Sequence, residues 1–342
     1  MKAVQIPDHG STDQITVNDV SEPEPGRGDV LLDVQAAALN HLDLWVLGGL
    51  PGVELDFPHT LGSDACGIVR ETGPDVSRFE EGDRVVINAG MSCGSCEQCR
   101  RGEQSCCDSF YLLGEHVDGT FAEQVTVPEE NCAMAPGHLE DTEAAAFPLV
   151  FLTAWRMLHT RVGLESGDTV LIHGIGGGVS SAALTLATAA DARCIVTSGS
   201  EDKLDRASEL GASNGIHYEQ ESVTDRVRSI TNGRGVDVVV DNVGQETWEE
   251  SVSCARTGGS IVTCGATTGP AAETNIHQLY WKQLNIYGST MGSHDDFRRM
   301  MRWVRQTKME PIIDRVYPLD EARKAEERLQ EGQQFGKIVL EV

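Results

Sequence analysis

Five of the ten cysteines lie within fifteen residues, in the stretch CGSCEQCRRGEQSCC that runs from Cys93 to Cys107. Four of them, Cys93, Cys96, Cys99 and Cys107, are separated by two, two and seven residues. Thiolates two residues apart in tight turns can converge on one ion, and four thiolates complete the closed tetrahedral shell of a structural zinc site. The spacing therefore predicts one structural Zn²⁺ at these four residues, in preference to unliganded surface cysteines. Cys106 is left out because it adjoins Cys107.

A second stretch with chemical meaning is the turn GIGGGVS, which follows the apolar run TVLIH and precedes an Ala-rich segment. Between a strand and a helix, glycines allow backbone amides to approach a pyrophosphate, and the positive end of the helix favours its charge. The sequence predicts a dinucleotide site there, formed by Gly174, Gly176, Gly177, Gly178 and Val179.

The elements that must position these residues follow two patterns. Residues 1–149 alternate short β-like runs, such as DVLLDVQAAAL and DRVVINAG, with Gly, Pro and Asp, as in a small irregular barrel. From residue 150 on, continuous apolar runs such as VDVVVDNVG and GSIVTCGATTG are separated by helical segments such as KLDRASELGA. That alternation predicts an α/β fold with a parallel sheet covered on both faces.

The chain has 342 residues, enough for about two domains, and a formal net charge of −26, from 27 basic and 53 acidic residues. Proteins that bind nucleic acids or membrane surfaces neutralise phosphates with Lys and Arg, so the balance argues against both partners and favours a small-molecule substrate. No apolar run is long enough to span a bilayer and no signal peptide is recognised, so a cytoplasmic location is expected. Only six of the basic residues are lysines. Many carboxylates with few lysines resemble the composition of halophilic proteins.

The order of several motifs resembles that of the medium-chain dehydrogenase/reductase superfamily, which comprises the zinc-type alcohol dehydrogenases and their quinone-oxidoreductase-like relatives. The motifs are LGSDACGIVRETG, GDRVV, the four-cysteine lobe, GTFAEQVTVP, FLTAW, GIGGGVS and the terminal FGKIVLEV. The resemblance implies a GroES-like β-barrel catalytic domain over residues 1–149, with a zinc lobe at about 91–110. It also implies a Rossmann domain with a doubly wound parallel sheet over 150–288, and a return to the catalytic domain over 289–342. An NAD(P)-dependent oxidoreductase that forms a homodimer or homotetramer is expected.

In the alcohol dehydrogenases of that superfamily a second, catalytic zinc is held by two cysteines and a histidine. The matching positions here are Asn40 in ALNHLD, Ser63 in LGSD and Leu149, four residues before Thr153. Asn and Ser are poor zinc ligands, and Leu is none. The resemblance therefore implies a member that keeps the structural zinc and has no catalytic Zn²⁺.

The missing ligands bear on the reaction. A simple alcohol is oxidised through an alkoxide that a metal stabilises, whereas hydride attack on an enone, quinone or enoyl thioester gives an enolate that hydrogen-bond donors can hold. We therefore expect an NADPH-dependent reductase of an activated C=C bond or a quinone. Two alternatives stay open. One is an alcohol or polyol dehydrogenase with no catalytic zinc or an unconventional site, for example at His59 and Asp64, and the other is a nucleotide-binding protein without catalytic activity.

The candidate catalytic donors are Asn40, His41, Asp43, His59 and Asp64. The first three share the segment that lines the cleft under the nicotinamide in the enzymes that this chain resembles, and the last two lie near the vacant metal position. Asn40 is the leading candidate, because it replaces a zinc ligand and related zinc-free reductases have Asn there. For each residue the alternative is a packing or capping role, with water delivering the proton.

Cofactor preference is decided at the end of the second strand of the dinucleotide domain, in IVTSGSEDK. The NAD-dependent members have Asp where this chain has Ser198, and an acidic residue there binds the ribose 2′-OH and repels a 2′-phosphate. Ser200 and Lys203 are placed to hold such a phosphate, so NADP(H) is favoured over NAD(H), although Glu201 and Asp202 oppose it. The resemblance adds further cofactor contacts, at Thr153, Asn242, Gly244, Gly265, Ala266, Ser289 and Met291.

Two arginines that follow Thr153, Arg156 and Arg161, are expected to be solvated helix charges, with a phosphate-bearing acyl-CoA as the alternative partner. The cysteines outside the lobe lie in apolar surroundings and are expected to be small buried hydrophobes. They are Cys66, Cys132, Cys194, Cys254 and Cys264.

Overall fold

The computed structural model describes all residues from 1 to 342. The chain forms two compact units. Unit 1 consists of Met1–Leu149 together with Gly292–Val342, and unit 2 consists of Val150–Met291. None of the helices is both long and apolar enough to cross a lipid bilayer.

Unit 1 is built on antiparallel pairing around one long central strand. Its main sheet has seven strands in the order β10-β6-β5-β3-β18-β17, with β9 also paired to β3, and two smaller sheets have the orders β2-β1-β4 and β7-β8. Only β17 and β18 run parallel. The strands are β1 (Lys2–Ile6), β2 (Thr16–Asp19), β3 (Asp29–Ala38), β4 (His59–Thr60), β5 (Asp64–Thr72), β6 (Arg84–Ile87), β7 (Gly90–Met91), β8 (Tyr111–Leu112), β9 (Gln124–Pro128), β10 (Cys132–Met134), β17 (Ile313–Pro318) and β18 (Lys337–Glu341).

The helices of unit 1 lie between these strands and in the C-terminal segment. They are α1 (His41–Gly48), α2 (Glu97–Arg100), α3 (Asp141–Ala145), α10 (His294–Thr307) and α11 (Ala322–Gln330). Helix α4 (Pro148–Trp155) begins at the end of the first segment and continues as a π-helix over Arg156–Val162.

Helix α1 is a departure from the sequence prediction, which assigned this segment to the barrel. The carboxylate of Asp43 accepts the backbone N–H of Asn40 at 2.7 Å, and this reciprocal end of a capping box satisfies a donor at the start of the helix. The run HLDLWVLG forms two helical turns. Its N-cap residue is Asn40, and its N-terminus is capped by the side chain of Asp43, three residues further along the chain.

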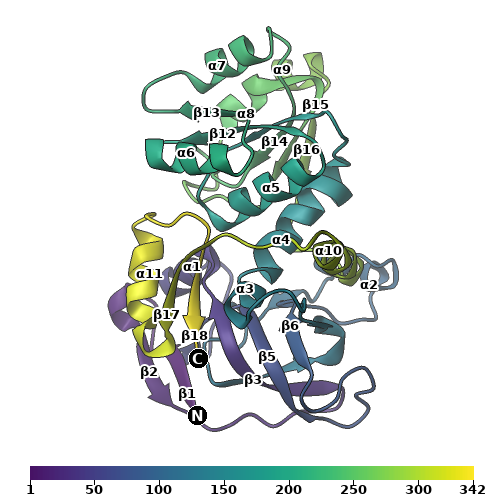
Figure 1. Cartoon of the computed structure of the whole chain (residues 1–342), viewed down its shortest axis with the longest axis vertical. Helices are drawn as coiled ribbons and strands as arrows, with labels where there is room; N and C mark the ends of the chain where they lie inside the picture. Colours follow the sequence, from purple (N-terminus) through teal and green to yellow (C-terminus); the bar gives the residue numbers. More distant parts are fainter. The chain divides into compact units, whose positions relative to one another are not determined.

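Unit 2 is the doubly wound parallel domain that the sequence predicts. Its six strands are all parallel, in the order β13-β12-β11-β14-β15-β16, and the inner strands are buried on both faces. Figure 1 shows α5 and α6 along one face of this sheet and α7, α8 and α9 along the other. The elements are β11 (Thr169–Ile172), α5 (Gly178–Ala189), β12 (Arg193–Ser198), α6 (Glu201–Glu209), β13 (Asn214–His217), α7 (Val223–Ile230), β14 (Val236–Asp241), α8 (Trp248–Cys254), β15 (Ala255–Thr263), α9 (Ile276–Trp281) and β16 (Asn285–Gly288).

The core of unit 2 explains the continuous apolar runs of its strands. Side chains from five strands and two helices pack in one buried cluster: Leu171, Ile195, Ile216, Val223, Val227, Val236, Val239, Val252, Cys254, Ala255 and Ile261. Because strand order reverses between β11 and β14, the carboxyl ends of these two strands flank the crevice where doubly wound sheets bind ligands.

Candidate active site and zinc lobe

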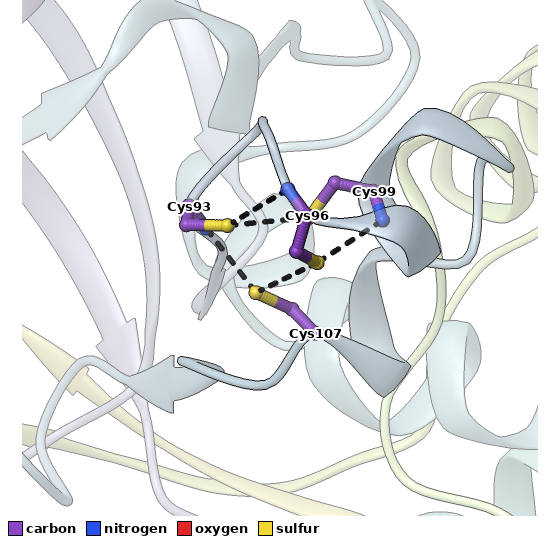
Figure 2. A group of neighbouring side chains, drawn as sticks. All are labelled: Cys93, Cys96, Cys99 and Cys107. Carbon is purple, nitrogen blue, oxygen red and sulfur yellow. Dashed lines mark hydrogen bonds between the residues drawn. The ribbon is translucent and has the colours of Figure 1, made fainter.

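The four predicted ligand cysteines converge in one lobe of unit 1 (Figure 2). Their sulfur atoms all lie within 4.8 Å of one another, with Cys93 Sγ and Cys99 Sγ 4.0 Å apart and Cys96 Sγ and Cys107 Sγ 3.8 Å apart. A tetrahedral shell with Zn–S bonds of about 2.3 Å places sulfur atoms about 3.8 Å apart. The four residues therefore fit a structural zinc ion, and Cys106, which is exposed, is not one of the group.

Backbone N–H groups point at Cys93 Sγ and Cys96 Sγ and favour thiolates at these two residues. The N–H of Cys96 donates to Cys93 Sγ at 3.3 Å, and that of Cys99 donates to Cys96 Sγ at 3.4 Å. Donation from the backbone of Ser95, and next from that of Cys96, lowers the pKa of Cys93 to about 6. The tight turn before Cys96 requires Gly94, whose φ of +68° is in the left-handed region.

A buried polar cluster centred on Lys337 includes Asn40, one of the three positions that match catalytic zinc ligands in the alcohol dehydrogenases that this chain resembles. The ammonium of Lys337 donates to Asn40 Oδ1 at 2.6 Å, to the Leu39 carbonyl at 2.6 Å and to Asp64 Oδ2 at 3.0 Å. The amide nitrogen of Asn40 donates to Asp64 Oδ2 at 2.9 Å and to the Ala38 carbonyl at 3.3 Å. We call Asn40, Asp64 and Lys337 the Lys337 cluster.

Both charges of the Lys337 cluster are fully enclosed. Lys337 is 4% exposed and Asp64 is 0% exposed, and the second carboxylate oxygen of Asp64 accepts the backbone N–H of Leu149 at 2.8 Å. A buried carboxylate is tolerated only with a partner charge and further hydrogen bonds, and Asp64 has both. Strand β18 brings the cation to this place by pairing Val339 with Ala38 at the end of β3.

Two further carboxyl groups are buried beside the cluster. Asp43 on α1 and Glu326 on α11 are each 1% exposed, and Asp43 Oδ1 and both carboxyl oxygens of Glu326 have no hydrogen-bond partner. Burial raises the pKa of Asp43 to about 7. Burial, with the charge of Asp43 as a second cause, raises the pKa of Glu326 well above its usual value. The buried site of Glu326 therefore favours its neutral form over its charged form.

The remaining predicted donors, His59 and His41, are not part of the cluster, and neither is Ser63, which matches a zinc-ligand position. His59 is 2% exposed, and its Nε2 lies 3.1 Å from the Gly114 carbonyl, so the ring has a packing role. Ser63 Oγ donates to the Leu113 carbonyl at 2.7 Å. His41 is exposed at the start of α1, where it packs edge-to-face on Trp45 with ring centroids 5.1 Å apart. Local desolvation lowers the pKa of His41, so its imidazole is neutral at pH 7.

This arrangement changes the interpretation of Asn40. Both hydrogens of its side-chain amide are directed at protein acceptors, and its oxygen accepts from Lys337. No hydrogen is left for a substrate oxygen, so the structure does not favour the donor role predicted for Asn40. Sequence reasoning singled out neither Lys337 nor Glu326. The available signal for Lys337 was a lysine inside the apolar strand FGKIVLEV, in a chain that has only six.

In unit 2 the glycine-rich turn joins β11 to α5. Gly174 and Gly176 have φ of +64° and +110°, which L-residues with side chains rarely adopt, and α5 begins at Gly178. Ser180 Oγ lies 2.9 Å from the His173 carbonyl and 3.1 Å from Asn242 Oδ1. Ser180, in the first turn of α5, therefore ties this turn to the loop after β14.

The loop DNVG after β14 is organised by Asp241, which sequence reasoning missed. This carboxylate is 0% exposed and accepts the backbone N–H groups of Val243 and Gly244, each at 3.0 Å. It also accepts the hydroxyl of Ser251 at 2.7 Å. A Cβ at Gly244 would lie 2.8 Å from Ala266 Cα, so the glycine lets the loops after β14 and β15 approach each other.

The residues of this crevice fit a dinucleotide. Ser181 Oγ, in the first turn of α5, and Ser289 Oγ, directly after β16, are buried hydroxyls with no partner in the protein, and such groups cost stability unless a ligand or water binds them. The other predicted contacts after strand ends, Gly265, Ala266 and Met291, border the same edge of the sheet. Thr153 Oγ1, on α4, lies 3.9 Å from Met291 Sδ.

The predicted 2′-phosphate residues surround the start of α6. Ser198 Oγ accepts the N–H of Ser200 at 3.1 Å, and Ser200 Oγ accepts the N–H of Lys203 at 3.4 Å. A carboxylate that sequence reasoning did not consider is also near, because a Cβ at Gly199 would lie 3.1 Å from Glu219 Oε1.

Two other sequence predictions have mixed outcomes. Arg156 is 2% exposed, so the prediction of a solvated charge is wrong for it, since the π-helix turns it inward. Arg161 is exposed, and its Nε donates to the Gly288 carbonyl at 3.1 Å. Four of the isolated cysteines, Cys66, Cys132, Cys194 and Cys254, are buried as predicted, whereas Cys264 is half-buried.

A doubly wound parallel sheet with a glycine-rich turn at its switch point, together with a β-barrel unit that carries a four-cysteine lobe, defines the class of two-domain nicotinamide-dependent oxidoreductases. Two family models match: the alcohol dehydrogenase GroES-like domain over residues 26–137 and the zinc-binding dehydrogenase domain over 178–306. The chain therefore belongs to the zinc-type alcohol dehydrogenases of the medium-chain dehydrogenase/reductase superfamily, and it is an oxidoreductase.

Individual relatives extend over nearly the whole chain. A zinc-type alcohol dehydrogenase-like protein of Schizosaccharomyces pombe is 32% identical, with 96% of each chain covered. The acryloyl-coenzyme A reductase of Metallosphaera sedula is 30% identical, with 99% of each covered. The crystal structure of an NAD-dependent alcohol dehydrogenase is 43% identical, with each chain covered in full and a TM-score of 0.96. The relatives thus include both a dehydrogenase and an enoyl thioester reductase.

Proposed function

We propose that this protein is an NADPH-dependent reductase of an activated C=C bond or a quinone, in which no catalytic zinc takes part. Its substrate would be an enone, a quinone or an enoyl thioester. The cofactor supplies the hydride, and a proton from the protein or water completes the two-electron reduction of the substrate. The acryloyl-coenzyme A reductase among the relatives supports this choice of substrate class.

The observation that carries the proposal is the Lys337 cluster. The positions matching the zinc ligands hold Asn40, Ser63 and Leu149, and the amide of Asn40 and the carboxylate of Asp64 are bonded to an ammonium ion. A divalent cation there would meet a fixed positive charge and only one side-chain carboxylate, so these residues do not fit a catalytic zinc. The four cysteines are the one group of converging metal-ligand side chains in the described chain.

Of the predicted donors, we propose that His41 provides the hydrogen bond to the developing enolate. Its ring nitrogens make no hydrogen bond within the protein and its side chain is exposed, unlike Asn40 and His59. A neutral imidazole can donate one N–H, and one such donor contributes roughly a hundredfold to kcat. Asn40, Asp64 and Lys337 then act as positioning residues, because they fix the backbone between β3 and α1.

The test is a substrate panel combined with a zinc count. NADPH oxidation with benzoquinone, methyl vinyl ketone and crotonyl-CoA, together with one zinc per chain, is the expected result. His41→Ala should lower kcat for the accepted substrate and leave the zinc content unchanged. Oxidation of saturated alcohols that depends on a second, chelatable zinc would overturn the proposal.

The second candidate function is an alcohol or polyol dehydrogenase, and it is favoured by the 43% identical structure of an NAD-dependent alcohol dehydrogenase. An unconventional zinc at His59 and Asp64 has little support here. The Nε2 of His59 lies against the Gly114 carbonyl, and both oxygens of Asp64 already accept hydrogen bonds. The same substrate panel, run with NAD⁺ and NADP⁺, separates the two functions.

For the cofactor we propose NADP(H), supported by Ser198 at the end of β12 and by Ser200 and Lys203 at the start of α6. We predict that Lys203→Ala raises the KM for NADPH roughly tenfold to a hundredfold, the effect of losing one charge-assisted contact, and leaves the KM for NADH nearly unchanged. Steady-state kinetics with both cofactors measure this. Equal increases in the KM for NADPH and for NADH would show that Lys203 stabilises α6 and does not bind the 2′-phosphate. Glu219 would then be the residue that favours NADH.

A further inference from the structure

A pocket of about 540 Å³ in unit 1 is lined by four arginines, Arg78, Arg298, Arg302 and Arg305, with apolar side chains between them. No carboxylate is among its lining residues. The whole chain has 53 acidic residues against 27 basic ones, so a concave surface of this composition is opposite in charge to the rest of the protein.

The sequence places these arginines together through helix spacing. Arg298, Arg302 and Arg305 are four and three residues apart on α10 (Figure 1), so they lie along one face of the helix. The segment from Arg298 to Lys308 contains five basic residues and no acidic one. The fourth arginine, Arg78, comes from a loop after β5 that is more than 200 residues away in the chain.

Carbonyl groups hold two of the guanidinium groups in place without neutralising them. Arg78 Nη1 donates to the Glu129 carbonyl at 3.0 Å, and the Arg78 guanidinium lies 5.2 Å from the centroid of the Phe79 ring. Arg305 Nη2 donates to the Met134 carbonyl at 2.5 Å.

Two of the nearby carboxylates already have partners within the protein. Asp295 pairs with Arg298 at 3.1 Å and with Arg299 at 2.7 Å, and Glu129 Oε2 accepts the backbone N–H groups of Ser77 and Arg78. Arg302 has no hydrogen bond or ion pair in the described chain. At least one guanidinium group in the pocket is therefore without a counter-ion.

We propose that this pocket binds an organic phosphate, that is, a phosphate ester carried on an apolar or aromatic body. Guanidinium groups match phosphate oxygens in a bidentate geometry, and several of them converging favour a dianion over a single carboxylate. Phe79 and the buried Met301 supply apolar surface for the body of the ligand. The volume is within the range of small-molecule sites.

Two sources of this ligand share the same chemistry. One is the phosphorylated adenosine of a coenzyme A thioester, which rests on the proposed function, and the other is a free nucleotide that binds whatever the substrate is. Adenosine 3′,5′-bisphosphate reproduces that phosphorylated adenosine without the thioester, so it is the probe for both.

The experiment is calorimetric titration of the full chain with adenosine 3′,5′-bisphosphate. NADPH is kept saturating to block the cofactor site, at the lowest salt that keeps the protein folded, since salt screens exposed charges. Arg302→Gln should weaken binding roughly tenfold or more, the effect of one charge-assisted contact. Arg299→Gln is the matched control on the same helix, because Arg299 pairs with Asp295 and does not line the pocket, and it should bind like the wild type.

Competition separates the two sources. If the bisphosphate raises the KM for crotonyl-CoA but not for benzoquinone, the pocket holds the coenzyme A end of the substrate. If it binds without changing either KM, or if the protein turns over neither compound, the pocket takes a free nucleotide. Equal affinity in Arg302→Gln and Arg299→Gln would overturn the proposal. A change of oligomeric state in Arg302→Gln without any change in nucleotide affinity would also overturn it, and would assign the arginines to contact with a second copy.

Discussion

Single residues near the Lys337 cluster set how stability depends on pH. Asp43 is buried, and its pKa is raised to about 7 in the folded chain from an ordinary value of 3.8. A raised acid pKa contributes stability that is complete below about pH 4 and is lost as the pH rises toward 7, because the folded state then has to release the proton that it binds more tightly.

We predict that Asp43→Asn removes the loss of stability that occurs as the pH rises toward 7. Asn keeps an oxygen that can accept the Asn40 N–H and never ionises, so the unfolding free energy of the variant relative to the wild type should rise by about 2 to 4 kcal/mol between pH 4 and pH 8. Urea unfolding at several pH values measures it. The control is Asp320→Asn, at an exposed residue. Its unfolding free energy relative to the wild type should change by less than about 0.5 kcal/mol over the same pH range. A flat difference for Asp43→Asn would show that Asp43 is ionised throughout.

The same residues show which parts of the site a sequence can predict. The metal-binding role of Cys93, Cys96 and Cys99 can be predicted from the sequence, because ligands of one ion are close neighbours in the chain. Lys337 and Glu326 reach Asn40 and Asp43 from almost 300 residues away. Their placement depends on β18 pairing with β3, a tertiary contact that local spacing does not encode. The donor role of Asn40 was predicted without knowledge of those partners.

At the scale of elements, the cysteine lobe has very little secondary structure of its own. It contains the four-residue α2 and the two-residue strands β7 and β8, far less than an isolated segment needs to fold. Most of its stability must therefore come from the metal, since structural zinc contributes roughly 10 to 16 kcal/mol in model peptides.

We predict that Cys96→Ser loses the zinc ion and melts at a lower temperature, with oxidoreductase activity falling only as far as the folded fraction falls. Cys106→Ser provides the matched control, because Cys106 lies one residue from a ligand and is exposed, and it should keep both zinc and Tm. Zinc analysis alongside calorimetry gives the answer. A Cys96→Ser protein that lacks zinc but melts like the wild type would show that the lobe needs no metal.

The elements of both units were predictable where their pattern is local. The buried strands β11, β12, β14 and β15 and the helix α6 were predicted from apolar runs and spacing, and the α/β class is confirmed. Helix α1 was not predicted, because its apolar run has no strong 3.6-residue periodicity. The cap formed by Asn40 and Asp43 decides its structure.

At the scale of the whole molecule, the edge strand β16 of the parallel sheet is a candidate contact surface for the expected homo-oligomer. Strand β16 has a neighbour on one side only, and exposed apolar side chains lie on it and on α9, namely Ile276, Tyr280, Trp281 and Ile286. No acidic residue occurs from Thr274 to His294. An uncharged edge strand in an acidic protein is suited to antiparallel pairing with the same strand of a second copy.

We predict that Trp281→Glu, at a side chain that is 72% exposed, turns a dimer into a monomer, because it places a charge in that apolar contact. Tyr218→Glu is the control, since Tyr218 is also exposed on unit 2 but lies outside α9 and β16. Sedimentation equilibrium gives the mass of both variants. An unchanged mass for Trp281→Glu would move the interface elsewhere.

The net charge of −26 is the basis of a further prediction at this scale. Self-repulsion between carboxylates destabilises a compact chain, and salt screens it. If the protein comes from a salt-loving microbe, as its composition suggests, its Tm should rise steadily between 0.1 and 2 M KCl. Differential scanning calorimetry in KCl would show this, and a Tm that is constant or falls would remove the halophilic interpretation.

Unit 1 is assembled from both ends of the chain, and this has a consequence for the order in which the protein can be made. Strand β18 is the inner neighbour of β3 in the main sheet and carries Lys337, yet it follows the whole of unit 2 in the chain. A ribosome therefore releases the continuous unit 2 as a foldable domain while Asp64 still lacks its cation and β3, although paired with β5 and β9, lacks β18. Folding of residues 1–149 into unit 1 has to wait until β18 has been synthesised, and chains stalled at residue 334 should show unit 2 protected from protease while residues 1–149 are digested.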